Sequence, residues 1–144
     1  MPSHHFGNDE RLVAMQHRAR ALVLRSSVWR TELAIATERG KATSYSKSQL
    51  GDWKVQRKIF AISVNDEVLY PDYAFDFKHR FQPYPGLTLV IKILSEKKDD
   101  WGIAYWFASA NRWLGGARPQ DMLAVDPARV IAAARIETMG ITHG

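Results

Sequence analysis

The spacing of apolar residues predicts two helices at the start of the chain. The first runs from a cap at Asn8 or Asp9 to about Arg25, because apolar side chains return there every three or four residues. Ser27 can cap a second helix that continues to about Glu38, and Gly40 can end it. The expected buried stripes are Leu12, Met15, Ala19, Leu22 and Val23 in the first helix and Trp29, Leu33 and Ala36 in the second.

A third, short helix and a β-hairpin are predicted next. Residues 46–54 place Leu50 and Trp53 three positions apart, so both can face the second helix. Residues 59–64 are rich in β-branched and aromatic side chains, and residues 68–70 can return antiparallel after a tight turn at 65–66. Three helices followed by a hairpin is the order of a helix-turn-helix with a wing.

The second half is predicted to be helical after an aromatic connection. Residues 72–85 carry five aromatic side chains without a sustained period, which indicates an ordered segment held by its rings. A helix begins near Gly86, with Leu87, Val90, Ile91 and Leu94 as its stripe. Further helices are expected after Asp99 or Asp100, at Pro119, and after Asp126 with Pro127, the last ending at Gly140.

These elements predict a mainly α fold with one small β-hairpin. At 144 residues, 46% of them apolar, the chain is long enough to bury a core. We expect a helix-turn-helix-like unit with its hairpin over residues 1–70 and a helical unit over residues 71–144.

The basic charge of the chain is confined to its first half. Residues 1–64 hold 11 Lys and Arg against 5 Asp and Glu, a net charge of +6, whereas residues 65–144 hold 9 against 10, a net charge of −1, which together give the +5 of the chain. Halves of such different charge suggest different partners, and a basic half is typical of binding to a phosphate backbone.

Duplex DNA is therefore the partner expected for the first half. Gln49 can make a bidentate contact with adenine from the third helix, and the lysines would mainly meet phosphates. The alternative is a plain three-helix bundle whose basic exterior only keeps it soluble. The candidate DNA-binding residues are Lys41, Lys47, Gln49, Lys54, Arg57 and Lys58.

Aromatic residues around the loop 109–116 indicate either core or a protein interface. Trp106, Phe107 and Trp113 are large enough to fill a core, but Trp and Arg anchors beside a glycine turn are also typical of binding hot spots. The candidate partner-binding residues are Trp106, Trp113, Leu114 and Arg118.

The residue inventory does not favour an enzyme. Without cysteine there is no disulfide, thiolate metal site or cysteine nucleophile, and no orienting carboxylate is obvious for His4, His5, His17 or His143. Asp72, Asp76 and His79 have a spacing that could hold a metal, but such aspartates more often form turns. We expect no metal, no cofactor and no membrane contact, because no stretch approaches the roughly 20 apolar residues of a span, and we expect a cytoplasmic location.

Two stretches of the chain carry a family resemblance. Residues 106–123, W-F-A-S-A-N-R-W-L-G-G-A-R-P-Q-D-M-L, resemble the C-terminal toxin-binding domain of the Xre/MbcA/ParS antitoxin family, through Trp106, Phe107, Asn111, Leu114, Gly116, Pro119, Met122 and Leu123. Residues 52–76 are similar to the segment that precedes this domain in a proteobacterial branch of the family.

The resemblance implies an antitoxin-like adaptor or transcriptional regulator. Its helical domain would bind a RES-type protein toxin and often form a homodimer, and its helix-turn-helix would repress an operon. The alternative is a protein-interaction or dimerisation module of a mobile or cassette gene, with no role on DNA.

Overall fold

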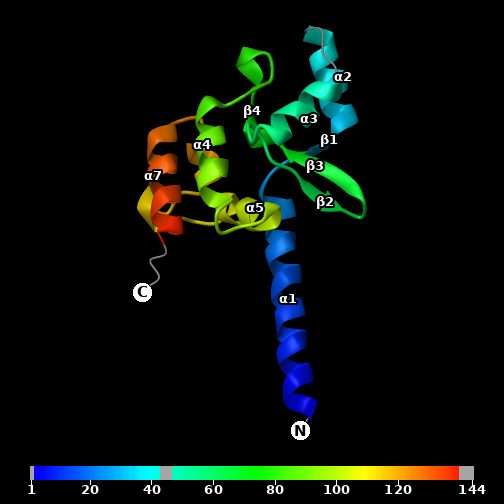
Figure 1. The fold of residues 1–144 in the computed structure, drawn as a ribbon, viewed down its shortest axis with the longest axis vertical. Helices are drawn as coiled ribbons and strands as arrows, with labels where there is room; N and C mark the ends of the chain where they lie inside the picture. The colour runs from blue at the N-terminus through cyan, green and yellow to red at the C-terminus, as the bar shows by residue number, and fades with distance from the viewer. Residues whose placement is uncertain (1, 43–46, 140–144) are drawn as a thin grey trace.

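The chain folds into a helical body from which one long helix projects (Figure 1). The computed structural model describes residues 2–42 and 47–139, and for residues 2–6, 39–42 and 47–48 it describes the backbone alone. Helices account for 63% of the structure, and its sheets of three and two strands are small and antiparallel. The prediction of a mainly α fold with small β parts is confirmed.

Helix α1 (Pro2–Ser26) packs on the body only near its C-terminal end. Its main contact is α5 (Asp100–Ala108), whereas its N-terminal part extends away from the body (Figure 1). Val23 is buried, but Leu12 and Met15 are 60% and 56% exposed. The predicted apolar stripe of the first helix is therefore only partly covered.

The segment after α1 is a strand, where sequence predicted the start of a helix. Residues Trp29–Thr31 form β1, and α2 begins at Glu32 and continues to Ala42, past Gly40. The hydroxyl of Thr31 caps α2 by accepting a hydrogen bond from the Ala34 N–H at 3.1 Å. Residues 29–31 pair with a strand far along the chain, and this pairing outweighs the local helical spacing. Helix α2 therefore buries Ile35, whereas Leu33, which was predicted to be buried, is 66% exposed.

Helix α3 (Lys47–Val55) and a hairpin follow in the predicted order. The first strand is shorter than the predicted 59–64, because residues 59–61 are buried in the core without strand pairing. Strands β2 (Ile62–Val64) and β3 (Glu67–Pro71) pair antiparallel around Asn65 and Asp66, whose φ angles of 50° and 66° are those of a type I′ turn. Strand β1 pairs with the other edge of β3, which gives the sheet order β1-β3-β2. The hairpin is thus two strands of a three-stranded sheet.

The aromatic connection is ordered by short elements. It contains η1 (Asp72–Ala74), β4 (Phe75–Asp76), η2 (Phe77–His79) and β5 (Gln82–Pro83), and β4 pairs with β5. The Tyr73 ring packs at a tilt against the rings of Phe60 and Phe107, with ring centroids 6.2 Å and 5.2 Å away. The rings hold this segment to the body, as the sequence predicts.

Helices α5 and α7 (Pro127–Thr138) begin at their predicted aspartate caps, and α4 (Pro85–Leu94) begins at Pro85, one residue before its predicted start. Helix α4 buries its predicted stripe, and the Asp99 carboxylate caps α5 by accepting from the Gly102 N–H at 2.8 Å. After η3 (Arg112–Leu114) and α6 (Pro119–Met122), Asp126 caps α7. Helices α4 and α7 pack side by side (Figure 1). Gly140, the predicted end of the last helix, lies outside the described residues.

One hydrophobic core joins the two units that the sequence predicts. It contains Val23, Leu50 and Phe60 from the first 70 residues together with Leu94 and Phe107 from the rest. The rings of Phe60 and Phe107 stack with centroids 5.8 Å apart. Within the described part of the chain, no helix is both long enough and apolar enough to cross a membrane.

Candidate nucleic-acid interface and partner surface

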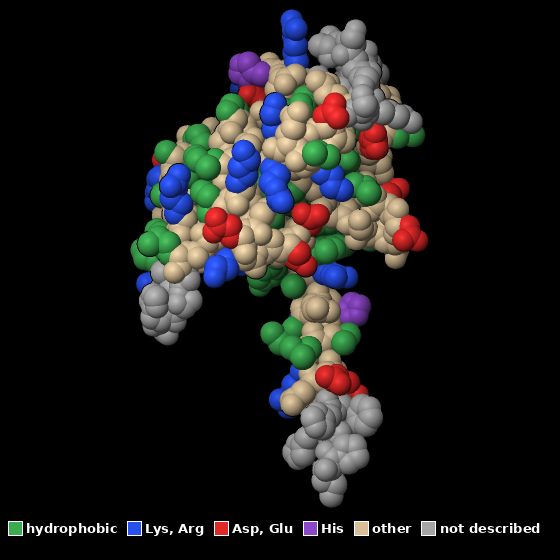
Figure 2. All heavy atoms as spheres, in the orientation of Figure 1, with side chains coloured by type: hydrophobic (Ala, Val, Ile, Leu, Met, Phe, Trp, Pro, Cys, Tyr) green, Lys and Arg blue, Asp and Glu red, His purple; other side chains and the backbone are tan. Residues whose placement is uncertain are grey.

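The C-terminal end of α3 brings three predicted DNA-binding residues together. Lys54 lies in the last turn of the helix, and Arg57 and Lys58 follow it directly. All three side chains are exposed. Figure 2 shows Lys and Arg side chains gathered on the face of the body that carries α3 and α4, with acidic side chains among them.

The backbone at this end of α3 forms a Schellman motif. The Arg57 N–H donates to the Lys54 carbonyl at 3.1 Å, and the Lys58 N–H donates to the Trp53 carbonyl at 2.8 Å. Arg57 has a φ of 59°, in the left-handed region that glycine usually occupies at this position. Arg57 thus has a left-handed backbone conformation that is unfavourable for a residue with a side chain.

A groove of about 490 Å³ lies beside this motif. Lys54 and Arg57 form its polar wall, and Ile59, Phe60 and Ile91 form its apolar lining. The Arg57 guanidinium also donates to the Ser95 hydroxyl at 2.7 Å, which joins the end of α3 to the end of α4. Burial raises the pKa of Asp100 at the edge of the groove, with a further rise from Asp99, and the charges of Lys54 and Arg57 oppose the rise.

The other predicted DNA-binding residues are only partly placed. Gln49 is half-buried on α3, and the two predicted anchors of this helix, Leu50 and Trp53, are buried. Lys41 and Lys47 belong to α2 and α3, but their side chains lie outside the described residues, as does the connection 43–46. Helices α2 and α3 are separated by these four residues, a length that a helix-turn-helix accommodates.

The hairpin carries no basic side chain. Its turn presents Asp66 and Glu67, both exposed, and the sequence has neither Lys nor Arg from Ile59 to Phe77. The hairpin therefore offers no cation to a phosphate backbone.

Some of the basic residues counted in the first half are neutralised internally. Arg30 bonds Asp72 at 2.6 Å and Glu38 at 3.0 Å. Burial lowers its pKa, but the hydrogen bonds and charges of Asp72 and Glu38 outweigh burial and raise it. Sequence reasoning missed this ion-pair cluster, because Arg30 and Asp72 meet only through the pairing of β1 with β3.

Two of the predicted partner-binding residues belong to the core. Trp106 is 6% exposed and Leu114 is 3% exposed, so neither offers a surface to a partner. Arg118 is also engaged, since its guanidinium makes two bonds to Asp121, at 2.7 Å and 3.1 Å. The carboxylate that pairs with Arg118 therefore belongs to the chain itself and not to a partner.

Trp113 is the predicted partner-binding residue that is free to make contacts. Its side chain is 51% exposed on η3, which is held rigidly by a bond from the Trp113 N–H to the Asn111 side chain at 2.9 Å. Gly115 and Gly116 follow with φ angles of 66° and 89°, which explains the two glycines of the loop. The Arg112 guanidinium lies 5.2 Å from the Trp113 ring centre, a cation–π contact.

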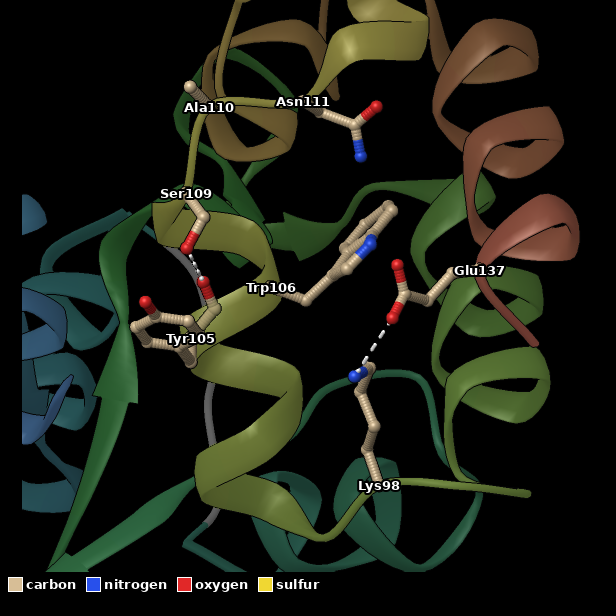
Figure 3. A pocket seen from close by; sticks show the side chains of 7 residues that line it. All are labelled: Lys98, Tyr105, Trp106, Ser109, Ala110, Asn111 and Glu137. Atoms are coloured by element: carbon tan, nitrogen blue, oxygen red, sulfur yellow. Dashed lines mark hydrogen bonds and ion pairs between the residues drawn. The ribbon is translucent and has the colours of Figure 1, made fainter. Parts of the chain in front are cut away.

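A small pocket lies beneath this loop, between α5 and α7 (Figure 3). Its volume is about 210 Å³. The ion pair of Lys98 and Glu137, 3.1 Å apart, stands on one side and Asn111 on the other, with the Trp106 indole between them. Sequence reasoning assigned no role to Lys98 or Glu137, because they are far apart in the chain.

The residues considered for a metal are used in other ways. Asp72 bonds Arg30, and the Asp76 carboxylate bonds the His79 ring at 2.6 Å. Among the residues that the structure describes, no group of three His, Asp or Glu side chains is arranged to hold a metal ion.

Comparison with protein-family models, with curated proteins and with solved structures gives no match for this chain.

Proposed function

We propose that the chain is an antitoxin-like adaptor that binds duplex DNA through α3 and a protein partner through the Trp113 loop, residues 109–116. The observation that carries the DNA half is topological. The order α1-β1-α2-α3-β2-β3, with the sheet order β1-β3-β2, is that of a winged helix-turn-helix, in which the third helix enters the major groove.

The cations at the end of α3 support the same proposal. Lys54, Arg57 and Lys58 would meet phosphates and fix the helix on the duplex, and Gln49 would read a base edge. The acidic turn of the hairpin is not suited to DNA binding, since Asp66 and Glu67 would repel a phosphate backbone. The expected contact is therefore confined to α3, with no contribution from the wing.

The partner half rests on Trp113 and on the sequence resemblance. An exposed tryptophan on a rigid glycine loop is a typical anchor for a protein interface. The resemblance of residues 106–123 to the antitoxin domain suggests a RES-type toxin as the partner and a homodimer as the assembly. Such an adaptor would work in the cytoplasm, beside bacterial DNA.

The alternative function is a protein-interaction module without a DNA role. It is favoured by the acidic hairpin turn and by the neutralisation of Arg30 within the fold. Fluorescence anisotropy with the DNA upstream of the gene and a scrambled duplex separates the two. Tighter binding to the upstream duplex supports the adaptor, and the absence of binding even at low salt supports the module.

A further inference from the structure

The Trp106 indole carries a hydrogen-bond donor that has no partner in the described structure. Its Nε1 is buried and makes no hydrogen bond. Figure 3 shows this nitrogen facing Glu137 across the pocket beneath the Trp113 loop. Because a buried donor without an acceptor is unfavourable, a bound group that supplies the acceptor is stabilised by it.

A second donor, the Asn111 amide, stands beside the indole in this pocket (Figure 3). The Asn111 side-chain oxygen accepts from the Trp113 N–H, which leaves the amide nitrogen directed toward the indole (Figure 3). The Ser109 hydroxyl donates to the Tyr105 carbonyl at 2.7 Å and is not an acceptor for the indole. The Tyr105 side chain points away from the indole (Figure 3), and the Lys98 ammonium and the Glu137 carboxylate bond each other.

We propose that this pocket binds an acidic side chain, Asp or Glu, of a protein partner. The incoming carboxylate replaces Glu137 beside Lys98 and accepts hydrogen bonds from the Trp106 indole and the Asn111 amide. A volume of about 210 Å³ is enough for one side chain. The positive charge of Lys98 selects the ionised carboxylate over a neutral amide of the same shape.

The pocket lies directly beneath the Trp113 loop. Asn111 contributes to both places, since it caps η3 and lines the pocket. A partner that contacts Trp113 would therefore have the pocket within reach of its neighbouring side chains. The proposal rests on the proposed function in one respect, because the protein partner supplies the acidic side chain. The chemistry of the pocket does not depend on the identity of that partner.

The test follows the indole N–H resonances of the folded chain by ¹⁵N–¹H NMR. The probe is N-acetylglutamate N-methylamide, the matched control is N-acetylglutamine N-methylamide, and Trp106→Phe assigns the resonance. We expect the Trp106 indole proton to move downfield in a saturable way with the glutamate probe and not with the glutamine probe, while the Trp113 resonance stays in place.

Two variants test the assigned partners. Glu137→Gln removes the competing carboxylate and should tighten the glutamate probe by about two- to fivefold, whereas Lys98→Gln should weaken it by a similar factor. Lys97→Gln removes a neighbouring charge that does not line the pocket and should leave the affinity unchanged.

Three results would overturn the proposal. They are an unmoved Trp106 resonance in both the natural chain and Glu137→Gln, an equal response to the two probes, or an unchanged affinity in Lys98→Gln. Failure of the DNA titration leaves this experiment unaffected, and failure here leaves the DNA titration unaffected, so the two proposals can fail separately.

Discussion

Arg57 combines an unfavourable backbone conformation with a side chain that is a candidate DNA contact. Its left-handed backbone closes the Schellman motif of α3, a place where a side chain costs roughly 1–2 kcal/mol relative to glycine. Residues held in such conformations cluster at functional sites. The Arg57 side chain lines the groove together with Lys54.

Arg57→Gly and Arg57→Ala separate the backbone from the charge. Both lose the guanidinium and should weaken DNA binding equally, but the glycine variant should be the more stable of the two by about 1 kcal/mol, because it relieves the left-handed strain. Urea denaturation and anisotropy titration measure the two effects. A glycine variant that binds DNA as well as the natural chain would remove Arg57 from the interface.

Trp113 provides the second prediction at the level of single residues. Because half of the ring is buried, Trp113→Ala should lower the free energy of unfolding by about 1–2 kcal/mol and leave the chain folded, but it should weaken self-association or binding of the partner. Leu33→Ala, which removes an exposed apolar side chain on α2, is the control and should change neither. If sedimentation and co-purification are the same for Trp113→Ala and the natural chain, the Trp113 surface is wrongly assigned.

Among the elements, those that local spacing and caps determine were predictable from sequence. Helix α4 buries its predicted stripe, and α5 and α7 start at the predicted aspartates. Strand β1 was not predictable, because Trp29–Thr31 is extended by its pairing with Leu69–Pro71, 40 residues away. The same limit applies to the pocket of Lys98 and Glu137, which forms only when the fold brings α7 opposite the residues of α5.

The candidate sites divide in the same way. The cations at the end of α3 all lie within residues 54–58 and could be found from charge alone. Whether an apolar residue near Trp113 is core or surface depends on the complete fold, so the sequence pattern could not separate buried Trp106 and Leu114 from exposed Trp113.

Helix α3 yields a prediction about salt dependence. If Lys54 and Lys58 each neutralise a phosphate, changing both to alanine should make the log-log slope of affinity against salt shallower by about 2, because each contact releases counterions. Arg135→Ala removes one exposed charge from α7 and should leave the slope unchanged. An unchanged slope in the double variant would mean that these lysines do not meet phosphates.

At the scale of the whole molecule, the shared core predicts that the two halves unfold together. Phe107 is fully buried and contacts both Phe60 and Tyr73, so Phe107→Ala should lower the free energy of unfolding by about 3–5 kcal/mol in one cooperative transition. Tyr105→Ala, on the exposed side of the same helix, should cost far less. Two separate transitions, seen by circular dichroism and by tryptophan fluorescence, would show that the halves are independent.

The proposed adaptor reads DNA through α3 while it holds a partner elsewhere. The most direct measurement is an anisotropy titration of the intact chain against its own upstream duplex and a scrambled duplex, each at two salt concentrations. The adaptor predicts tighter binding to the upstream duplex, affinity that falls as salt rises, and a loss of sequence preference in Gln49→Ala with the salt slope retained. Equal affinity for both duplexes would contradict the regulator, and no binding at low salt would contradict any role on DNA.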